Sequence, residues 1–305
     1  MRLIVAILAT LSVFHAAEVA GQAWVQPAGG YFVKLSASYL STSEQYNVNG
    51  DLEPIAAADP LLRSETFGDI AFTAYAEYGL TDRYTLVTRL PFKISSTENT
   101  QLPQIPGDTP REGTLTNGGL GDFWLWLRAP LAQASTAISV QVGVKVPLGY
   151  EEVPDNGGPA LGTGKIDAEI SLLAGQSLYP VPAYVSVGVG YRRRGGADFD
   201  DEVIYGIEGG YTTGPLFMKL RFEGLQNVGP IPPPDVQLPG GGASSSDANA
   251  RNQDRYQISP VAALNLSPTF ALTAEAYHAI GGKNTIGDTT WLLGVILTPA
   301  PTDPQ

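Results

Sequence analysis

Apolar and polar positions alternate singly over long stretches of this chain. Between Ala137 and Pro147, every even position from Ile138 to Val146 is aliphatic, and the residues between them are polar or small. Successive side chains of a β-strand point to opposite faces, so this pattern predicts a strand with one apolar and one polar face. The apolar face needs either a protein core or lipid beside it.

The same alternation recurs along the chain after its first 30 residues. The segments that show it are 31–39, 69–78, 84–93, 122–128, 137–147, 165–177, 183–193, 201–212, 216–227, 255–265, 269–280 and 288–298. Most are about as long as a tilted strand needs to be to cross a bilayer. There are twelve of them, and an even number of strands is typical of a bacterial outer-membrane barrel.

The connections between these segments alternate in length. Tight links with the sequences GLTDR, PLAQAST, LYPVP, TTGP and LSP take every second place. The links between them are mostly longer and polar, at 41–64, 94–118, 149–164 and 228–254, with shorter ones at 194–201 and 281–288. Outer-membrane barrels join their strands by short periplasmic turns and longer extracellular loops. The sequence therefore predicts an all-β fold: a transmembrane, antiparallel up-and-down β-barrel of about twelve strands.

Aromatic residues stand at both ends of the apolar face. If the short turns are periplasmic, the outward aromatic residues at the lower boundary are Tyr31, Tyr78, Tyr84 and Tyr211, and those near the upper boundary are Tyr39, Phe92, Tyr191, Tyr256 and Trp291. Mainly Ile, Val, Leu and Ala fill the outward positions between them. Two aromatic girdles around an aliphatic band are typical of a barrel in a membrane. We therefore expect the apolar face to contact lipid.

The first residues have the features of a secretory signal peptide. Arg2 gives a positive start, residues 3–13 give a short apolar run, and small residues within 19–23 offer cleavage sites. We assign 1–21 to the signal peptide and 22–305 to the barrel, with 228–254 as a long Pro-, Gly- and Ser-rich extracellular loop and 299–305 as a periplasmic tail. The predicted location is the cell outer membrane of a Gram-negative bacterium.

Composition narrows the classes of function. Charged residues make up only 16% of the chain, while 35 Gly and 24 Pro supply many turns. The net charge of −12 argues against a nucleic-acid partner, which needs a basic face. The chain has no Cys and only two His, so clusters of the usual Cys and His metal ligands are absent. We predict no metal site and no cofactor.

The polar face of the strands lines the barrel interior. The site residues that we predict to line the lumen are Asp69, Arg89, Lys93, Asp122, Trp124, Trp126, Arg128, Lys145, Asp167, Glu169, Arg192, Glu208, Lys219, Arg221, Glu223 and Glu275. Glu77, Tyr75, Leu173, Tyr184 and Phe217 share their parity. The bulky residues either fill the space or line a path for a partly apolar solute.

Opposite charges on neighbouring interior faces suggest ion pairs between strands. One plausible set of hairpin registers pairs Asp69 with Lys93, Asp122 with Lys145, Asp167 with Arg192, and Glu208 with Lys219. Such cross-strand pairs hold the register of a sheet. The alternative is that each charge is solvated on its own in the lumen.

Three features outside the lumen allow further interpretations. The PIPPP sequence in the longest loop is either a solvated spacer or a polyproline recognition motif. Arg193 and Arg194 are placed to bind lipopolysaccharide phosphates or to pair internally with Asp198, Asp200 and Asp201, and we favour internal pairing. His278 faces outward near the upper boundary, where a Ser–His pair at a lipase site is an alternative, but no acid is evident to orient its ring. We predict that the chain is not an enzyme and has no catalytic residues.

Three stretches resemble a known family of barrels. AWVQPAGGYFVKLSASYLS at 23–41, GLGDFWLWLRAPL at 119–131 and VPLGYEEVPDNGGPALGTGKIDAEISLLAGQSL at 146–178 are similar to outer-membrane proteins associated with phenol-degradation (meta-pathway) gene clusters. The resemblance covers nearly the whole mature chain and implies passage of hydrophobic or aromatic compounds across the outer membrane. Such barrels commonly end on an aromatic residue, whereas the last strand here is followed by PAPTDPQ.

The predicted function is that of an outer-membrane channel or transporter for small, hydrophobic or aromatic molecules. The alternative is a structural or surface-exposed barrel whose lumen is closed by its own charge pairs; a rim lipase is the third. The expected partners are outer-membrane lipids, lipopolysaccharide and a small hydrophobic solute.

Overall fold

The structure is a computed structural model that describes residues 23–103, 108–133, 135–151, 154–197, 199–231 and 252–299. Its elements are β1 (Tyr31–Thr42), β2 (Glu44–Tyr46), β3 (Leu52–Pro54), the 3-10 helix η1 (Ile55–Ala58), β4 (Leu62–Thr81), β5 (Tyr84–Gln101), β6 (Arg111–Leu120), β7 (Asp122–Gln133), β8 (Thr136–Pro147), β9 (Asp167–Ser177), β10 (Ala183–Arg193), β11 (Glu202–Thr213), β12 (Leu216–Asn227), β13 (Asp254–Ser267), β14 (Phe270–Lys283), β15 (Thr285–Ile286) and β16 (Thr289–Leu297). Within these described ranges, no helix has the length and apolar character needed to cross a membrane.

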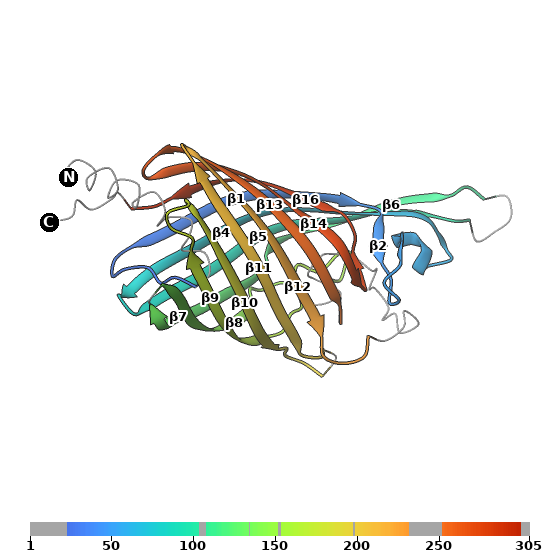
Figure 1. Cartoon of the computed structure of the whole chain (residues 1–305). Helices are drawn as coiled ribbons and strands as arrows, with labels where there is room; N and C mark the ends of the chain where they lie inside the picture. Colours follow the sequence, from blue (N-terminus) through green and yellow to red (C-terminus); the bar gives the residue numbers. More distant parts are fainter. Residues whose placement is uncertain are drawn as a thin grey trace, which may run out of the picture.

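The long strands close into one antiparallel barrel (Figure 1). Each strand pairs with its neighbours in sequence order, and β1 pairs with both β4 and β16, which closes the ring. β6 pairs with the outer part of β5 and β7 with its inner part, so β6 and β7 act as one strand interrupted at Gly121. Counted in this way the barrel has twelve strands, which confirms the predicted fold class.

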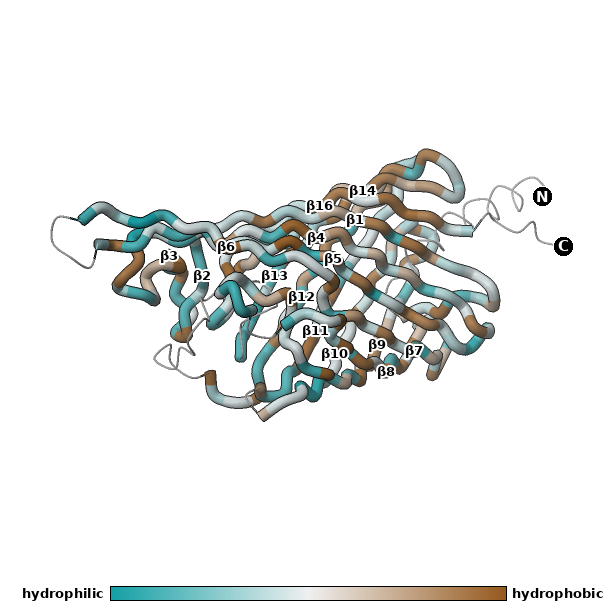
Figure 2. Tube along the Cα trace, turned by 180° about the vertical axis from the view of Figure 1, so that it is seen from behind, coloured by the Kyte–Doolittle hydropathy of each residue, from teal (hydrophilic) through white to brown (hydrophobic). Residues whose placement is uncertain are grey.

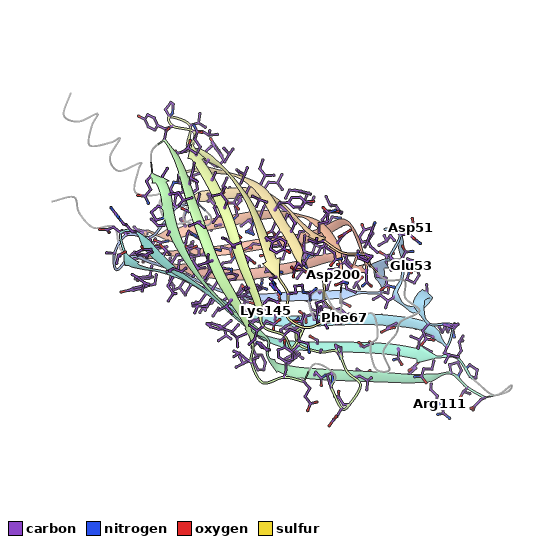
Figure 3. All side chains as sticks on the ribbon, turned by 90° about the horizontal axis from the view of Figure 1, so that it is seen from below. Asp51, Glu53, Phe67, Arg111, Lys145 and Asp200 are labelled. Carbon is purple, nitrogen blue, oxygen red and sulfur yellow. The ribbon has the colours of Figure 1, made fainter. Side chains whose placement is uncertain are left out.

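The strands reach beyond the segments predicted from alternation. The segment 94–118, predicted as a loop, is largely strand, because β5 continues to Gln101 and β6 begins at Arg111. These two strands form a hairpin that projects beyond the barrel, and Figure 3 marks Arg111 near its tip. Segment 41–64 likewise contains β2, β3, η1 and the start of β4. Alternation weakens once a hairpin leaves the membrane, because neither face then has to be apolar.

The outer face of the barrel is apolar, as predicted. Aliphatic side chains such as Val142, Ile170, Leu220 and Leu293 are exposed on the strands. Figure 2 shows hydrophobic colours recurring along the barrel strands and mostly hydrophilic or pale colours along the projecting β5–β6 hairpin. A closed barrel satisfies every backbone hydrogen bond of its strands, so this face can lie in lipid without unpaired polar groups.

The predicted girdle residues lie on this outer face. Tyr31, Tyr78, Tyr84, Tyr211, Tyr39, Phe92, Tyr191 and Trp291 are all exposed, and Tyr256 is partly exposed. β1 begins and β16 ends at the same end of the barrel, where the short turns lie. We call this the short-turn end and the opposite end the long-loop end. In outer-membrane barrels the short turns face the periplasm.

A small second sheet covers part of the long-loop end. β15, β2 and β3 form it, and Leu40, Ile55, Phe67 and Ile286 make a buried apolar cluster beneath it. The loop after β1 and the loop after β14, which lie on the same side of the barrel, are therefore joined at the long-loop end by their own core.

Candidate functional site: the barrel interior

The structure places the predicted lumen residues on the inner side of their strands. Most are buried, including Asp69, Lys93, Trp124, Arg128, Lys145, Asp167, Glu169, Glu208 and Glu275. Asp122, Trp126, Arg192, Lys219, Arg221 and Glu223 are partly exposed, and Arg89 is exposed. The interior is therefore crowded with side chains, but water reaches part of it.

Ion pairs cross the part of the interior nearer the short-turn end. Arg128 Nη2 lies 3.3 Å from Glu77 Oε1, and both side chains are almost fully buried. Arg221 lies 3.4 Å from Glu208 and 3.2 Å from Glu223. Lys219 Nζ lies 3.7 Å from Glu208. These contacts neutralise charges that would each be costly to leave unpaired in a low-dielectric interior.

A second group of ion pairs lies nearer the long-loop end. Lys145 Nζ contacts Asp122 at 3.3 Å and Asp167 at 2.6 Å, and it also donates to the hydroxyl of Thr163. Lys93 Nζ lies 3.4 Å from Asp69. The lysine at 145 thus joins β7, β8 and β9 to the loop that follows β8.

That loop folds inward. Residues 158–163 are all buried, and Leu161 packs over the backbone of Gly119 and Gly121. Tyr150 donates its hydroxyl hydrogen to Asp122, and burial together with this bond raises the pKa of Tyr150 above its ordinary value. The phenol therefore stays protonated and holds the loop to β7, which narrows the lumen from the long-loop end.

Aromatic and cationic side chains stack beside these pairs. Trp124 and Trp126 lie parallel, with ring centroids 4.9 Å apart and planes inclined by 4°. The Arg192 guanidinium lies over Trp124 at 4.7 Å. Trp126 occupies the space where a side chain at Gly143 would be, since a Cβ there would lie 2.0 Å from the ring. The lack of a side chain at Gly143 is what lets the indole lie flat on β8.

The short-turn end is occupied by the segment before β1. The carbonyl oxygen of Trp24 accepts a hydrogen bond from Arg128 Nη1 at 2.9 Å, and that of Ala23 accepts one from Ser139. Gln26 donates from its backbone to Thr85 and from its side chain to Glu77. We call residues 23–30 the N-terminal segment. It is bonded to both the β4–β5 side and the β7–β8 side of the interior.

The ring of Trp24 extends this contact across the barrel. It meets Tyr184 edge-to-face at 5.7 Å, and Tyr184 in turn stacks on Phe217. It also packs against the cluster of Ala23, Ala137 and Leu173, and over Gly175, where a Cβ would lie 2.4 Å from the indole. An apolar layer thus crosses the interior at the short-turn end.

The predicted cross-strand pairs are mostly correct. Asp69–Lys93, Asp122–Lys145 and Glu208–Lys219 are present. The prediction for Asp167 and Arg192 is wrong: Arg192 pairs with Glu169 at 3.0 Å and Glu202 at 2.9 Å, whereas Asp167 pairs with Lys145. The reason is register, because β9 places Glu169 directly opposite Arg192 and leaves Asp167 beside β8.

The cations after β10 also differ from the prediction in detail. Arg194 pairs internally, but with Glu202 at 3.0 Å, and its side chain packs on Phe199. Asp201 instead accepts a hydrogen bond from the Arg194 backbone. Arg193 is exposed on the outer side. Asp198 and most of the loop with the PIPPP sequence lie outside the described residues, as do the signal peptide and most of the predicted tail.

Several interior residues were not found from the sequence. Lys34 contacts Glu275, and its inward parity on β1 is a sequence signal that identifies it as an interior residue. Glu202 shares the parity of Glu208, but it is the first residue of β11, directly after the polar stretch that was predicted to be a loop. Trp24 precedes any strand, so periodicity gave no sign of its position. The inward fold of 158–163 depends on packing against Gly119 and Gly121, which a local pattern does not reveal.

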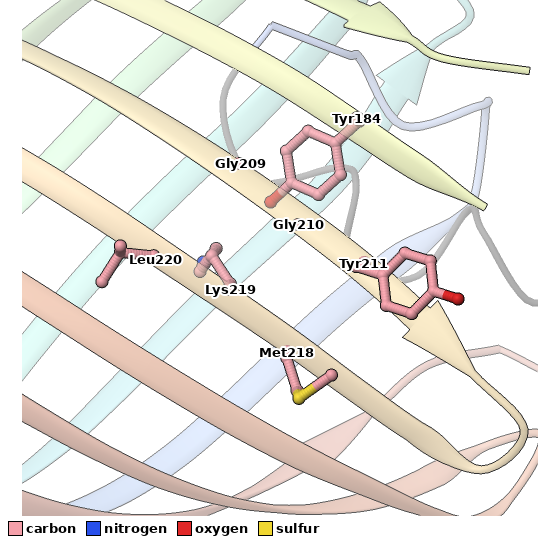
Figure 4. Close-up of a pocket in the computed structure, with 7 residues that line it drawn as sticks. All are labelled: Tyr184, Gly209, Gly210, Tyr211, Met218, Lys219 and Leu220. Atoms are coloured by element: carbon pink, nitrogen blue, oxygen red, sulfur yellow. The ribbon is translucent and has the colours of Figure 1, made fainter. Parts of the chain in front are cut away.

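One shallow depression of about 330 Å³ lies at the wall near the short-turn end (Figure 4). Gly209 and Gly210 have no side chains to fill this part of β11. Tyr184 lies on one side of them, and Tyr211 and Met218 lie near the other. The β11–β12 register is continuous from Glu202 to Thr213, so the wall is closed by backbone hydrogen bonds at this place.

The features considered for catalysis are separate from the interior. His278 is exposed on the outer side and its Nδ1 hydrogen-bonds Thr289 Oγ1 at 2.9 Å. No ion pair between His278 and a carboxylate is found in the part of the chain that the structure describes. Nor is any group of three or more His, Cys, Asp or Glu there placed to hold a metal ion.

Comparison with known proteins gives similarity in structure alone. No family model matches the sequence, and no curated protein matches it. The structure is similar to an outer-membrane channel from Pseudomonas putida F1, with a TM-score of 0.62 and 14% identity over 92% of this chain and 98% of that one. The Ralstonia pickettii toluene transporter TbuX matches with a TM-score of 0.45 and 8% identity over 89% of this chain and 90% of that one. The monoaromatic hydrocarbon channel CymD matches with a TM-score of 0.45 and 8% identity over 90% of this chain and 89% of that one.

The first of these similarities bears on the fold, and the other two are too weak to bear on it. The first similarity and the apolar outer face together indicate that the fold is that of an outer-membrane β-barrel.

Proposed function

We propose that this barrel is an outer-membrane channel for small hydrophobic or aromatic molecules. The observation that carries the proposal is the composition of the interior: aromatic side chains at successive levels, from Trp24 and Tyr184 to Trp124 and Trp126, beside charges that neutralise one another. A largely paired interior has only a weak net field, and aromatic surfaces favour a partly apolar solute. The similar Pseudomonas putida protein is likewise an outer-membrane channel, which agrees with a transport role.

The N-terminal segment favours a second candidate, a barrel whose lumen is closed. Its hydrogen bonds and the ring of Trp24 span the short-turn end. For transport, this segment has to move or leave a narrow path beside it. Lipids and lipopolysaccharide remain the expected surroundings on the outer face.

Substitution of Trp24 separates the two candidates. We expect Trp24→Ala to raise the single-channel conductance in planar bilayers several-fold, because the ring fills the space between Tyr184 and the Ala137–Leu173 cluster. The matched control is Trp291→Ala, which removes the same ring from the lipid-facing side and leaves the interior unchanged.

Uptake by cells tests the function itself. Expression in a porin-deficient Gram-negative strain should increase the uptake of benzyl alcohol over cells with an empty vector, and Trp24→Ala should increase it further. The closed structural barrel would be supported if the correctly folded wild type gave no uptake and no conductance and Trp24→Ala gave none either.

A further inference from the structure

Arg89 differs from the other interior cations. Lys34, Lys93, Arg128, Lys145, Arg192, Arg194, Lys219 and Arg221 each lie within 4.0 Å of a carboxylate oxygen. Arg89 makes no ion pair with any residue that the structure describes, and it is exposed although it lies on the inner side of β5. Its inward neighbours on the same strand, Val87 and Pro91, are buried.

The surroundings of Arg89 are aromatic. The register places it directly opposite Tyr75 on β4 and Trp124 on β7, both of which face inward. It is also close enough to Tyr277, on the inner side of β14, to interact with it electrostatically. Arg89 is therefore exposed on the inner side of β5, beside inward-facing aromatic residues of the two neighbouring strands.

This combination suits one class of ligand. A guanidinium offers a planar set of donors that matches the two oxygens of a carboxylate. Aromatic faces on either side give surface for a ring. A neutral aromatic hydrocarbon gains only a cation–π contact from the guanidinium and leaves its N–H donors without an acceptor. An aromatic anion uses both features at once.

We infer that Arg89 is a binding residue for aromatic carboxylates that pass through the barrel. This rests on the proposed channel function and narrows its solutes to ring compounds with an acidic group. In a chain of net charge −12, a free cation midway along the interior lowers the barrier that an anion meets there. Arg89 thereby selects among aromatic solutes by charge.

The test compares solutes that differ in charge and share a ring. Uptake of labelled benzoate, benzyl alcohol and benzylamine is measured in porin-deficient cells that express the wild type, Arg89→Gln or Arg83→Gln. Arg83 is the matched control, because it is an exposed cation in the turn between β4 and β5. Arg89→Gln should lower benzoate uptake about tenfold, as expected for loss of a charge-assisted contact, and leave benzyl alcohol uptake unchanged.

A binding measurement checks the same residue without transport. Benzoate added to the folded, purified barrel should quench the fluorescence of Trp124 and Trp126, and Arg89→Gln should abolish this quenching while Arg83→Gln preserves it.

Three outcomes are decisive. If the wild type admits benzyl alcohol but benzoate uptake and quenching are the same in Arg89→Gln, the inference is wrong and the channel function stands. If Arg89→Gln lowers the uptake of all three solutes equally, its role is structural and the inference is wrong. If the wild type admits none of them, the channel function is wrong and the inference falls with it.

Discussion

Replacement of Arg128 by Met should lower the free energy of unfolding by about 3–5 kcal/mol, the usual cost of leaving a buried charge without its partner. Arg128 is only 2% exposed, and Glu77, 3.3 Å away, is only 1% exposed. The substitution leaves the Glu77 carboxylate with hydrogen bonds from Tyr75 and Gln26 but without a cation. Urea titration of the folded barrel in lipid or detergent measures the loss.

The matched control is Lys219→Met. Lys219 also pairs with a buried carboxylate, but Glu208 keeps Arg221 at 3.4 Å and the Tyr184 hydroxyl at 2.8 Å. We therefore expect a much smaller loss. The double variant Arg128→Met/Glu77→Gln should recover part of the stability of Arg128→Met, since the uncompensated charge is gone. Additive losses in the double variant would show that the two residues act independently.

Arg128 also connects the stability of the barrel to its proposed passage. The same guanidinium that neutralises Glu77 donates to the carbonyl oxygen of Trp24 and to Gln141 Oε1. Loss of Arg128 should therefore loosen the N-terminal segment as well as the interior. The closure of the short-turn end and the Arg128–Glu77 pair are therefore one connected structure.

The fold could be predicted because a barrel in lipid imposes one strict condition on its strands. Every membrane-crossing strand must present an apolar face to lipid. Apolar residues therefore recur at every second position in segments such as 137–147. The parity that follows places Trp124, Lys145 and Glu208 inside without any knowledge of the three-dimensional structure. Tight turns such as GLTDR add the hairpin order.

The interior contacts could be predicted only in part, because parity does not fix register. Shifting a hairpin by two residues preserves every inward and outward position but changes which charges meet. Asp167 and Glu169 both face inward, so parity allows either carboxylate to pair with Arg192. Only the observed β9–β10 register assigns Arg192 to Glu169. Asp122 and Lys145 were matched correctly because β8 has a single interior cation.

Segments outside the strands escaped prediction for a different reason. The N-terminal segment and residues 158–163 lie inside the barrel because cavities there have the right shape, such as the space above Gly175 that accepts Trp24. No periodic pattern records the shape of a cavity formed by distant strands. Parity predicts that the candidate binding residue Arg89 faces the interior. Only the structure shows that, among the described residues, the other interior cations have carboxylate partners and Arg89 has none.

Replacement of Val142 by Arg tests the assignment of the two faces. Val142 lies in the middle of β8 with its side chain 46% exposed on the outer face. Arginine at the lipid-facing midplane of a barrel costs about 2–4 kcal/mol, so Val142→Arg should lower stability by that amount and impair insertion. Heat-modifiable mobility on a detergent gel and urea titration measure the two effects.

The control has to introduce the same charge on the inner face. Gln141, the neighbour of Val142, does not serve, because its Oε1 accepts a hydrogen bond from Arg128 Nε and an arginine there would face another guanidinium. Gln257 does serve, since its side chain donates to Glu223 at 2.9 Å and an arginine in its place can pair with that carboxylate. Gln257→Arg should therefore insert and fold much as the wild type does. If Gln257→Arg were the more damaging substitution, the polar face would be the one that contacts lipid, and the arrangement of the interior described above would be inverted.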